Sequence, residues 1–138
     1  MSCSPELCWR LLYTKSRAEA WVEINLRHQG YATLYPLIRG RSTLRPLFPR
    51  YIFAGFDPDQ SPRPLRSTLG VLYVVHCGEV PARVPHDVIA DVRSRMNERG
   101  IVTLDDAPAR DPLFERRERD RVRALVKFAA AGFRVRVA

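Results

Sequence analysis

The sequence is poor in the residues that build metal centres and covalent cross-links. It holds three cysteines (Cys3, Cys8 and Cys77) and three histidines among 138 residues. The cysteines are odd in number and lack a Cys-x-x-Cys spacing, and no Cys/His cluster supplies the roughly four ligands that zinc needs. We therefore expect free thiols in a reducing compartment, the cytoplasm, and neither a metal nor another cofactor.

Long apolar runs and catalytic motifs are also missing. No apolar stretch approaches the roughly 18 residues that span a bilayer, and we expect no signal peptide, since the first residues show no basic start before an apolar block. No histidine stands in a dyad-like pattern except His86-Asp87, which we interpret as a helix start. There is no phosphate-binding glycine loop. The sequence thus predicts a protein that contacts no membrane and is not an enzyme.

Lysine is almost absent, and arginine carries nearly all of the positive charge. The net charge is +8, and Lys15 and Lys127 are the only lysines. Residues 1–56 carry 8 basic and 3 acidic residues (+5), residues 57–110 carry 7 and 8 (−1), and residues 111–138 carry 8 and 4 (+4). Arginine binds phosphate and stacks on bases. The charge therefore favours contact with nucleic acid, although solubility and genomic base composition are an alternative explanation.

The segment Leu47–Phe56, LFPRYIFAGF, is the most apolar part of the chain. Its composition predicts a strand. Period-two alternation directs Leu47, Tyr51 and Phe53 to one face, and Phe48, Ile52, Ala54 and Phe56 to the other. Both faces are apolar, so we expect one to meet the protein's own helices and the other to meet a further layer or a partner.

Other elements follow from periodicity and from capping residues. Ser16 and Glu19 fit a capping box that opens a helix to about Gln29, with Gly30 after its end and Ala18, Val22 and Leu26 as its buried stripe. We expect strands at 9–15, 31–38, 47–56 and 71–76, a short extended segment at 79–84, and helices at 65–69 and 86–97. The order predicts an α/β (α+β) sandwich of the ferredoxin-like or RRM-like kind, with an antiparallel sheet and its helices on one face.

Five sequence blocks, in this order, resemble the N-terminal (NGN) domain of NusG-type transcription elongation factors, and the RfaH-like branch most closely. The blocks are WRLLYTK (9–15), NLRHQG (25–30), PLFPRYIFAGFDPD (46–59), RSTLGV (66–71) and VPHDVIADVRSR (84–95). The resemblance runs from Trp9 to about Leu104. It implies residues 1–104 as an NGN domain, 105–112 as a linker and 113–138 as a tail.

The resemblance implies a factor that binds RNA polymerase and suppresses pausing and termination. An apolar patch would dock on the clamp helices of the largest polymerase subunit, and the matching positions are Tyr13, Leu47, Tyr51, Phe53 and Cys77. A polar face would read the non-template DNA strand, and the matching positions are Lys15, Arg17, Asn25, Gln29, Arg66, Ser67 and Thr68. Leu69 stands where RfaH-like proteins carry an arginine.

The tail departs from the family pattern. Residues 119–123 resemble the start of a KOW domain, but the chain is too short to close that barrel. We therefore expect an incomplete KOW-like or helical tail, without contact to a ribosomal protein or Rho. One hypothesis is that 116–130 forms a helix on the Tyr51/Phe53 patch through Val122, Leu125, Val126 and Ala129; the alternative is a frayed tail. The end of the tail is ambiguous, since Phe133–Val137 alternates like a strand.

Two other functions compete with this interpretation. The segment RYIFAGF (50–56) is similar to the RNA-stacking strand of RRM domains, so the alternative is an RRM-like module that binds single-stranded RNA through Tyr51 and Phe53. A structural remnant without a partner is the third hypothesis.

Overall fold

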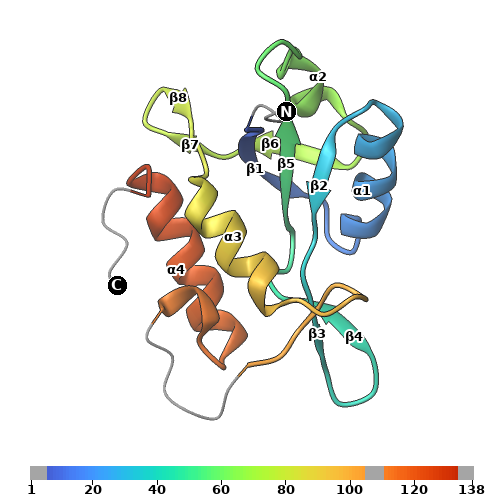
Figure 1. Ribbon diagram of the computed structural model, residues 1–138, viewed down its shortest axis with the longest axis vertical. Coiled ribbons are helices and arrows are strands. Elements are labelled where there is room, and N and C mark those ends of the chain that lie inside the picture. The colour runs from blue at the N-terminus through green and yellow to red at the C-terminus, as the bar shows by residue number, and fades with distance from the viewer. Residues whose placement is uncertain (1–5, 105–110, 134–138) are drawn as a thin grey trace, which may run out of the picture.

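The computed structural model describes residues 6–104 and 111–133, and Figure 1 shows the arrangement of their helices and strands. The elements are, in chain order, β1 (Cys8–Thr14), α1 (Glu19–His28), β2 (Ala32–Leu34), β3 (Leu37–Arg39), β4 (Leu44–Pro46), β5 (Tyr51–Phe56), α2 (Arg63–Ser67), β6 (Val71–Val74), β7 (His76–Cys77), β8 (Val80–Pro81), α3 (His86–Arg95), β9 (Ile101–Val102), the 3-10 turn η1 (Pro112–Phe114) and α4 (Glu118–Ala130). The α+β class predicted from the sequence is confirmed. No helix in the described ranges is long and apolar enough to cross a membrane.

The main sheet is antiparallel and has the strand order β2-β5-β1-β6. Its register places Tyr13 of β1 between Tyr51 of β5 and Tyr73 of β6. The expected strand from Leu47 is wrong in its first four residues, because β5 begins only at Tyr51. Arg50 has a left-handed φ of 72°, and the Tyr51 amide donates to the Phe48 carbonyl oxygen at 3.0 Å, so residues 48–51 form a tight turn instead.

Helices cover both faces of the main sheet, which corrects the expectation of helices on one face only. Val22 and Leu26 of α1 pack in one buried cluster with Leu12, Ile52 and Ala54. On the opposite face, α3 contributes Val88, Ile89 and Val92 to a second cluster that contains Trp9, Leu11 and Phe53. Figure 1 shows α1 on one side of β2 and β5, and α3 and α4 on the other. Successive strand residues point to opposite faces, so an apolar pattern on both faces needs two helical layers.

Smaller sheets extend this core. The expected strand at 31–38 is divided at Tyr35-Pro36 into β2, which joins the main sheet, and β3, which joins a second sheet of order β4-β3-β9. Pro36 cannot donate a backbone hydrogen bond to a continuous ladder. The β3–β4 hairpin carries Arg39, Arg41 and Arg45, whereas the parallel strand β9 was not predicted. β7 and β8 form a separate hairpin.

The start of α1 differs from the predicted capping box. Its N-cap is Ala18, without a side-chain cap, and Ser16 lies in the preceding turn. The Glu19 carboxylate is buried and accepts the Arg50 amide at 3.0 Å, so it serves tertiary structure and not its own helix. The helix end is as predicted: Gly30 has a φ of 89° and donates to Arg27 O, while Tyr31 donates to Leu26 O. This pair of bonds is a Schellman motif.

The part of the tail that the structure describes is helical, as one of the two hypotheses held. Leu113 and Phe114 of η1, and Leu125, Phe128 and Ala129 of α4, lie in the same buried cluster as Phe53. Residues 119–123, which resemble a KOW start in sequence, lie within α4. The alternative strand at Phe133–Val137 falls almost entirely outside the described residues, as does most of the expected linker at 105–112.

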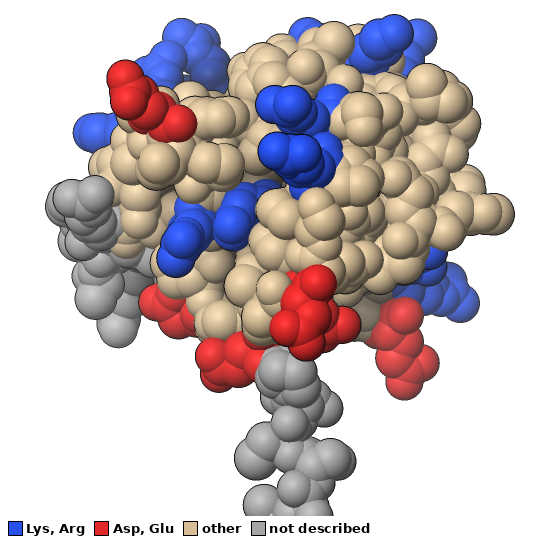
Figure 2. Space-filling view, turned by 90° about the horizontal axis from the view of Figure 1, so that it is seen from above, with Lys and Arg blue, Asp and Glu red and all other residues tan. Residues whose placement is uncertain are grey.

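Charged side chains are unevenly spread over the surface. Figure 2 looks onto the end of the molecule that carries α2, β7 and β8 in Figure 1. Lys and Arg side chains lie both in the middle of this face and along its edges, whereas Asp and Glu side chains lie mainly along its lower edge (Figure 2). This end is therefore suited to an anionic ligand.

Candidate functional site

Three tyrosines from adjacent strands form a continuous row on the main sheet. The ring centroids of Tyr13 and Tyr51 are 5.1 Å apart, and those of Tyr13 and Tyr73 are 4.9 Å apart with the rings stacked. Tyr73 is 50% exposed, and Tyr13 and Tyr51 are half-buried. Burial, with smaller contributions from Tyr73 and Tyr13, raises the pKa of Tyr51 to about 12. This tyrosine row offers amphipathic rings of the kind that is enriched in protein interfaces.

Arg50 fixes the central ring of the tyrosine row, Tyr13. Its guanidinium carbon lies 4.5 Å from the centre of the Tyr13 ring, and its Nε donates to the Thr14 carbonyl oxygen at 3.1 Å. The Glu19 carboxylate holds the Arg50 backbone in its left-handed conformation. The row is therefore held by three contacts and does not depend on ring packing alone.

The apolar patch expected from the sequence comprises Tyr13, Leu47, Tyr51, Phe53 and Cys77. Part of this patch is buried inside the protein. Leu47 and Phe53 are 0% and 1% exposed, while Cys77 of β7 is half-buried and packs against the same cluster. Of the two expectations for the surplus apolar face, a further layer or a partner, the structure therefore shows a further layer that the chain itself provides. Leu47 and Phe48 lie in one cluster and not on opposite faces, because residues 47–50 form no strand.

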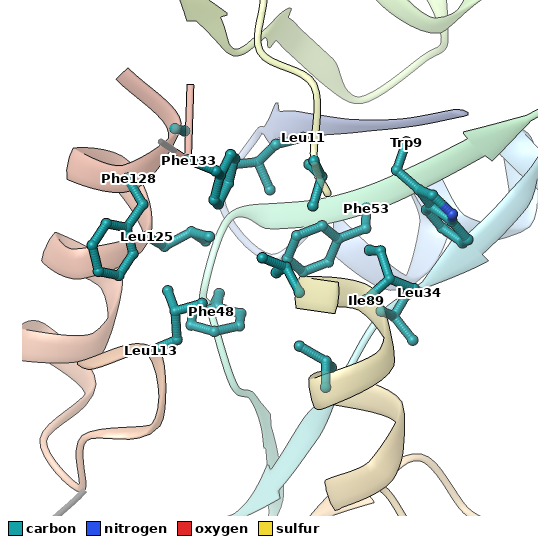
Figure 3. Packing of buried hydrophobic residues seen from close by; sticks show 14 of the residues in the cluster. Trp9, Leu11, Leu34, Phe48, Phe53, Ile89, Leu113, Leu125, Phe128 and Phe133 are labelled. Carbon is teal, nitrogen blue, oxygen red and sulfur yellow. The ribbon is translucent and has the colours of Figure 1, made fainter. Parts of the chain in front are cut away.

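Helices α3 and α4 lie over this patch together. Figure 3 shows Leu125 and Phe128 of α4 and the following Phe133 on the side of the cluster opposite α3, with Leu11 and Phe53 between them. The buried face of α4 is formed by Arg121, Leu125, Phe128 and Ala129. The expected stripe was therefore partly wrong, since Val126 is 40% exposed and Val122 is only half-buried.

A buried arginine anchors α4 to the patch. Arg121 is 3% exposed, and its Nε donates to the Leu47 carbonyl oxygen at 2.7 Å. Its Nη1 donates to the carbonyl oxygens of Glu115 and Arg116 at 3.2 and 3.0 Å. Burial lowers the pKa of Arg121, with Glu118 opposing this effect. At the surface, Glu118 and Arg45 form an ion pair of 2.7 Å between α4 and β4.

The polar residues expected to read DNA gather around α1 and the end of α2. Gln29 Nε2 donates to Thr68 Oγ1 at 2.8 Å, and Asn25 Nδ2 donates to the Leu69 carbonyl oxygen at 3.3 Å. The Lys15 amide donates to the Gly70 carbonyl oxygen at 2.9 Å. The structure thus brings Lys15, Asn25, Gln29 and Thr68 together from segments far apart in the sequence.

The members of this polar face differ in accessibility. Arg17 lies exposed in the turn before α1, and Arg66 and Ser67 are exposed on α2. Thr68 is only 5% exposed, and its hydroxyl already donates to the Pro64 carbonyl oxygen at 2.9 Å. Its role within the described structure is to hold Gln29, and its hydroxyl is not free for a ligand.

Two residues of these surfaces were missed by the sequence reasoning. Tyr73 could have been found from its alternation within VLYV only if its register opposite Tyr13 had been known. Trp21 of α1 is 49% exposed, with its ring beside Gly70. Only its position off the Val22/Leu26 stripe hinted at this.

The structure offers little support for the other chemistries considered. Cys8 and Cys77 are free thiols, and the described residues contain no group of His, Cys, Asp and Glu that could hold a metal ion. RRM-like stacking needs aromatic rings on an open sheet face, but Phe53 is buried beneath helices. Cys3 lies outside the described residues.

The fold and these surfaces together define an α+β interaction module that carries a row of aromatic side chains and a separate polar face. A family model described as NusG, transcription termination factor nusG, matches residues 7–93, which is more than half of the chain. The chain therefore belongs to the NusG family. Proteins of this family are transcription elongation and termination factors that bind RNA polymerase without being enzymes themselves.

Proposed function

We propose that this protein is an elongation and antitermination factor of the RfaH-like branch that docks on the clamp helices of the largest RNA polymerase subunit. The docking surface is the expected apolar patch, to which we add Tyr73. The observation that carries the proposal is the half-exposed tyrosine row, which is continuous with apolar side chains that α4 covers. An amphipathic helix of a partner binds to such a surface through aliphatic and aromatic anchors.

The second part of the proposal is that α4 controls access to the patch. Leu47 and Phe53 are closed to any partner while α4 is docked. A polymerase helix that needs these side chains must therefore compete with Leu125 and Phe128 of α4. The apparent affinity for polymerase is then lowered by the fraction of molecules in which α4 is docked. In this proposal residues 1–104 are the binding domain, 105–112 the linker and 113–138 a regulatory tail.

The third part is that the polar face contacts non-template DNA. Lys15, Arg17 and Arg66 carry charges for phosphate, whereas the amides of Asn25 and Gln29 suit base edges. The exposed ring of Trp21, which lies beside Gly70 on this face, provides a surface on which a base can stack. Thr68 acts by positioning Gln29.

The test measures binding of fluorescently labelled protein to purified polymerase core enzyme. The double substitution Tyr13→Ala/Tyr73→Ala removes half-exposed rings, and we expect at least about tenfold weaker binding, since aromatic residues dominate interface energetics. Trp21→Ala is the matched control, because it removes an equally exposed ring from the opposite face. Equal affinities of the double variant and this control would refute the docking surface.

A second experiment tests whether α4 blocks the patch, by weakening the packing of α4 in the full chain. Leu125→Ser/Phe128→Ser removes two of its buried anchors, and we expect tighter binding to the core enzyme than wild type shows. Arg123→Ser/Val126→Ser changes the exposed side of the same helix and should leave the affinity unchanged. Unchanged affinity in the first variant, with α4 shown by hydrogen exchange to be undocked, would contradict control by α4.

A further inference from the structure

A cavity of about 270 Å³ lies at the end of the molecule where α2 faces β6, β7 and β8. Its walls include three arginines and a histidine, together with apolar side chains; the main lining residues are Arg10, Arg63, Arg66, His76, Leu65 and Val74. Its volume is near the lower end of the range for small-ligand sites, which begins at about 300 Å³. A ligand of this cavity is therefore a single compact unit.

The cavity contains positive charge without a matching carboxylate. No acidic residue lines it, and Arg10, Arg63 and Arg66 form no ion pair with any described residue. Arg83 adds a further positive charge beside Arg10, its backbone partner in an isolated β-bridge. Figure 2 shows basic side chains in the middle of this end of the molecule. Like charges that converge without a counter-charge raise the free energy of the unliganded fold, and an anion would lower it.

Arg10 is held in place within this group. Its guanidinium carbon lies 5.0 Å from the centre of the Phe56 ring, and its Nη1 donates to the Trp9 carbonyl oxygen at 3.2 Å. Burial, followed by the charge of Arg83, lowers the pKa of Arg10. A guanidinium offers five N–H donors, so Arg10 keeps donors for a ligand while its orientation is fixed by protein contacts.

The two kinds of wall indicate the chemical class of the ligand. Arginines bind phosphate oxygens through paired N–H groups and also stack on planar rings. Leu65 and Val74 provide the apolar contact that a flat heterocycle needs. We propose that this cavity binds one nucleotide unit, with its phosphate on Arg10 and Arg63 and its base against Leu65 and Val74.

The nucleotide can come from two sources, which share this chemistry. One is a free mononucleotide, and the other is a nucleotide within a single strand. Arg66 belongs to α2, whose following residues contact Asn25 and Gln29 of the polar face, so a strand that crosses α2 could reach both surfaces. The inference goes beyond the proposed function, since it requires neither polymerase nor the Lys15 side of the polar face.

The experiment titrates the full chain with adenosine monophosphate and, in a second arm, with a short single-stranded oligodeoxynucleotide. Binding is followed by calorimetry and by fluorescence anisotropy. Arg63→Met removes an exposed charge of the cavity. Arg10→Met removes the charge of the arginine that protein contacts hold in place, and it keeps an unbranched aliphatic side chain. Arg39→Met removes an exposed charge from β3 in the second sheet and is the matched control. Circular dichroism verifies that each variant is folded.

We expect each cavity variant to weaken binding about ten- to a hundredfold, the range for the loss of a charged hydrogen bond, while the control stays near wild type. Weaker binding of both probes by the cavity variants would support a site for free nucleotides and strands. Weaker binding of the oligonucleotide alone would support the strand as the source. The inference is overturned if neither probe binds, or if the cavity variants bind as the control does. Oligonucleotide binding that falls with Lys15→Ala but not with Arg63→Met would overturn the cavity and leave the proposed polar face intact.

Discussion

Removal of the Arg121 side chain is the most direct test of how α4 is held. Arg121→Ala deletes three hydrogen bonds, to the carbonyl oxygens of Leu47, Glu115 and Arg116. Hydrogen bonds from a charged donor contribute about 1.5–3 kcal/mol each, but the substitution also removes the cost of burying a guanidinium, which the lowered pKa of Arg121 reflects. Only the Leu47 bond joins α4 to the preceding domain, so we expect a net loss of about 1–3 kcal/mol in the free energy of α4 docking.

Amide hydrogen exchange measures this loss, because α4 amides exchange through undocking and need not wait for global unfolding. Urea unfolding of the full chain shows whether the loss also reaches the core. Arg123→Ala is the control: this arginine is exposed on the same helix, so its removal should change stability by less than about 0.5 kcal/mol. Equal exchange of α4 amides in both variants would refute the anchoring role of Arg121.

Two further predictions concern the fold around the binding surfaces. Gly70→Ala should cost about 2–5 kcal/mol in thermal unfolding, because Gly70 has a φ of +92° and an added Cβ would lie 2.5 Å from Val22 Cγ2. Gly78→Ala, at a φ of +65° with open space around it, should cost only about 1–2 kcal/mol, and equal losses would contradict the packing argument. The second prediction follows from the pKa of Tyr51, which is about 12 against about 10 in an unfolded chain. The folded state holds this proton more tightly, so the free energy of unfolding should fall as pH rises from about 10 to about 12. Tyr51→Phe should reduce that slope in urea titrations at alkaline pH, and an unchanged slope would show that Tyr51 does not contribute.

Local signals in the sequence predicted individual elements well. Gly30 ends α1 because a left-handed residue is needed for the two closing hydrogen bonds. The alternation in Tyr51–Phe56 predicted the two buried faces of β5, since side-chain direction in a strand depends only on position. The family blocks also singled out candidate surface residues, and the structure brings Lys15, Asn25, Gln29 and Thr68 together; their contact with DNA stays a prediction.

Signals that depend on distant partners were misread. Ser16 and Glu19 have the spacing of a capping box, but the Glu19 carboxylate binds the Arg50 amide, which lies 31 residues away in the sequence. Competition between a local and a tertiary hydrogen bond is decided by which one is buried with better geometry, and spacing along the chain contains no information on that. Tyr73 was missed for a similar reason, because its neighbours are set by the pairing of β6 with β1.

By itself, the sequence determined that this protein is an α+β interaction module with a basic surface and no motif of a metal site or a catalytic centre. Tertiary structure alone decided that helices lie on both faces of the sheet and that α3 and α4 together close over Leu47 and Phe53. It also decided that Arg10, Arg63 and Arg66 converge on one cavity. The physical reason is the same in each case: periodicity states which side chains must be buried, whereas the packing of distant segments selects what buries them.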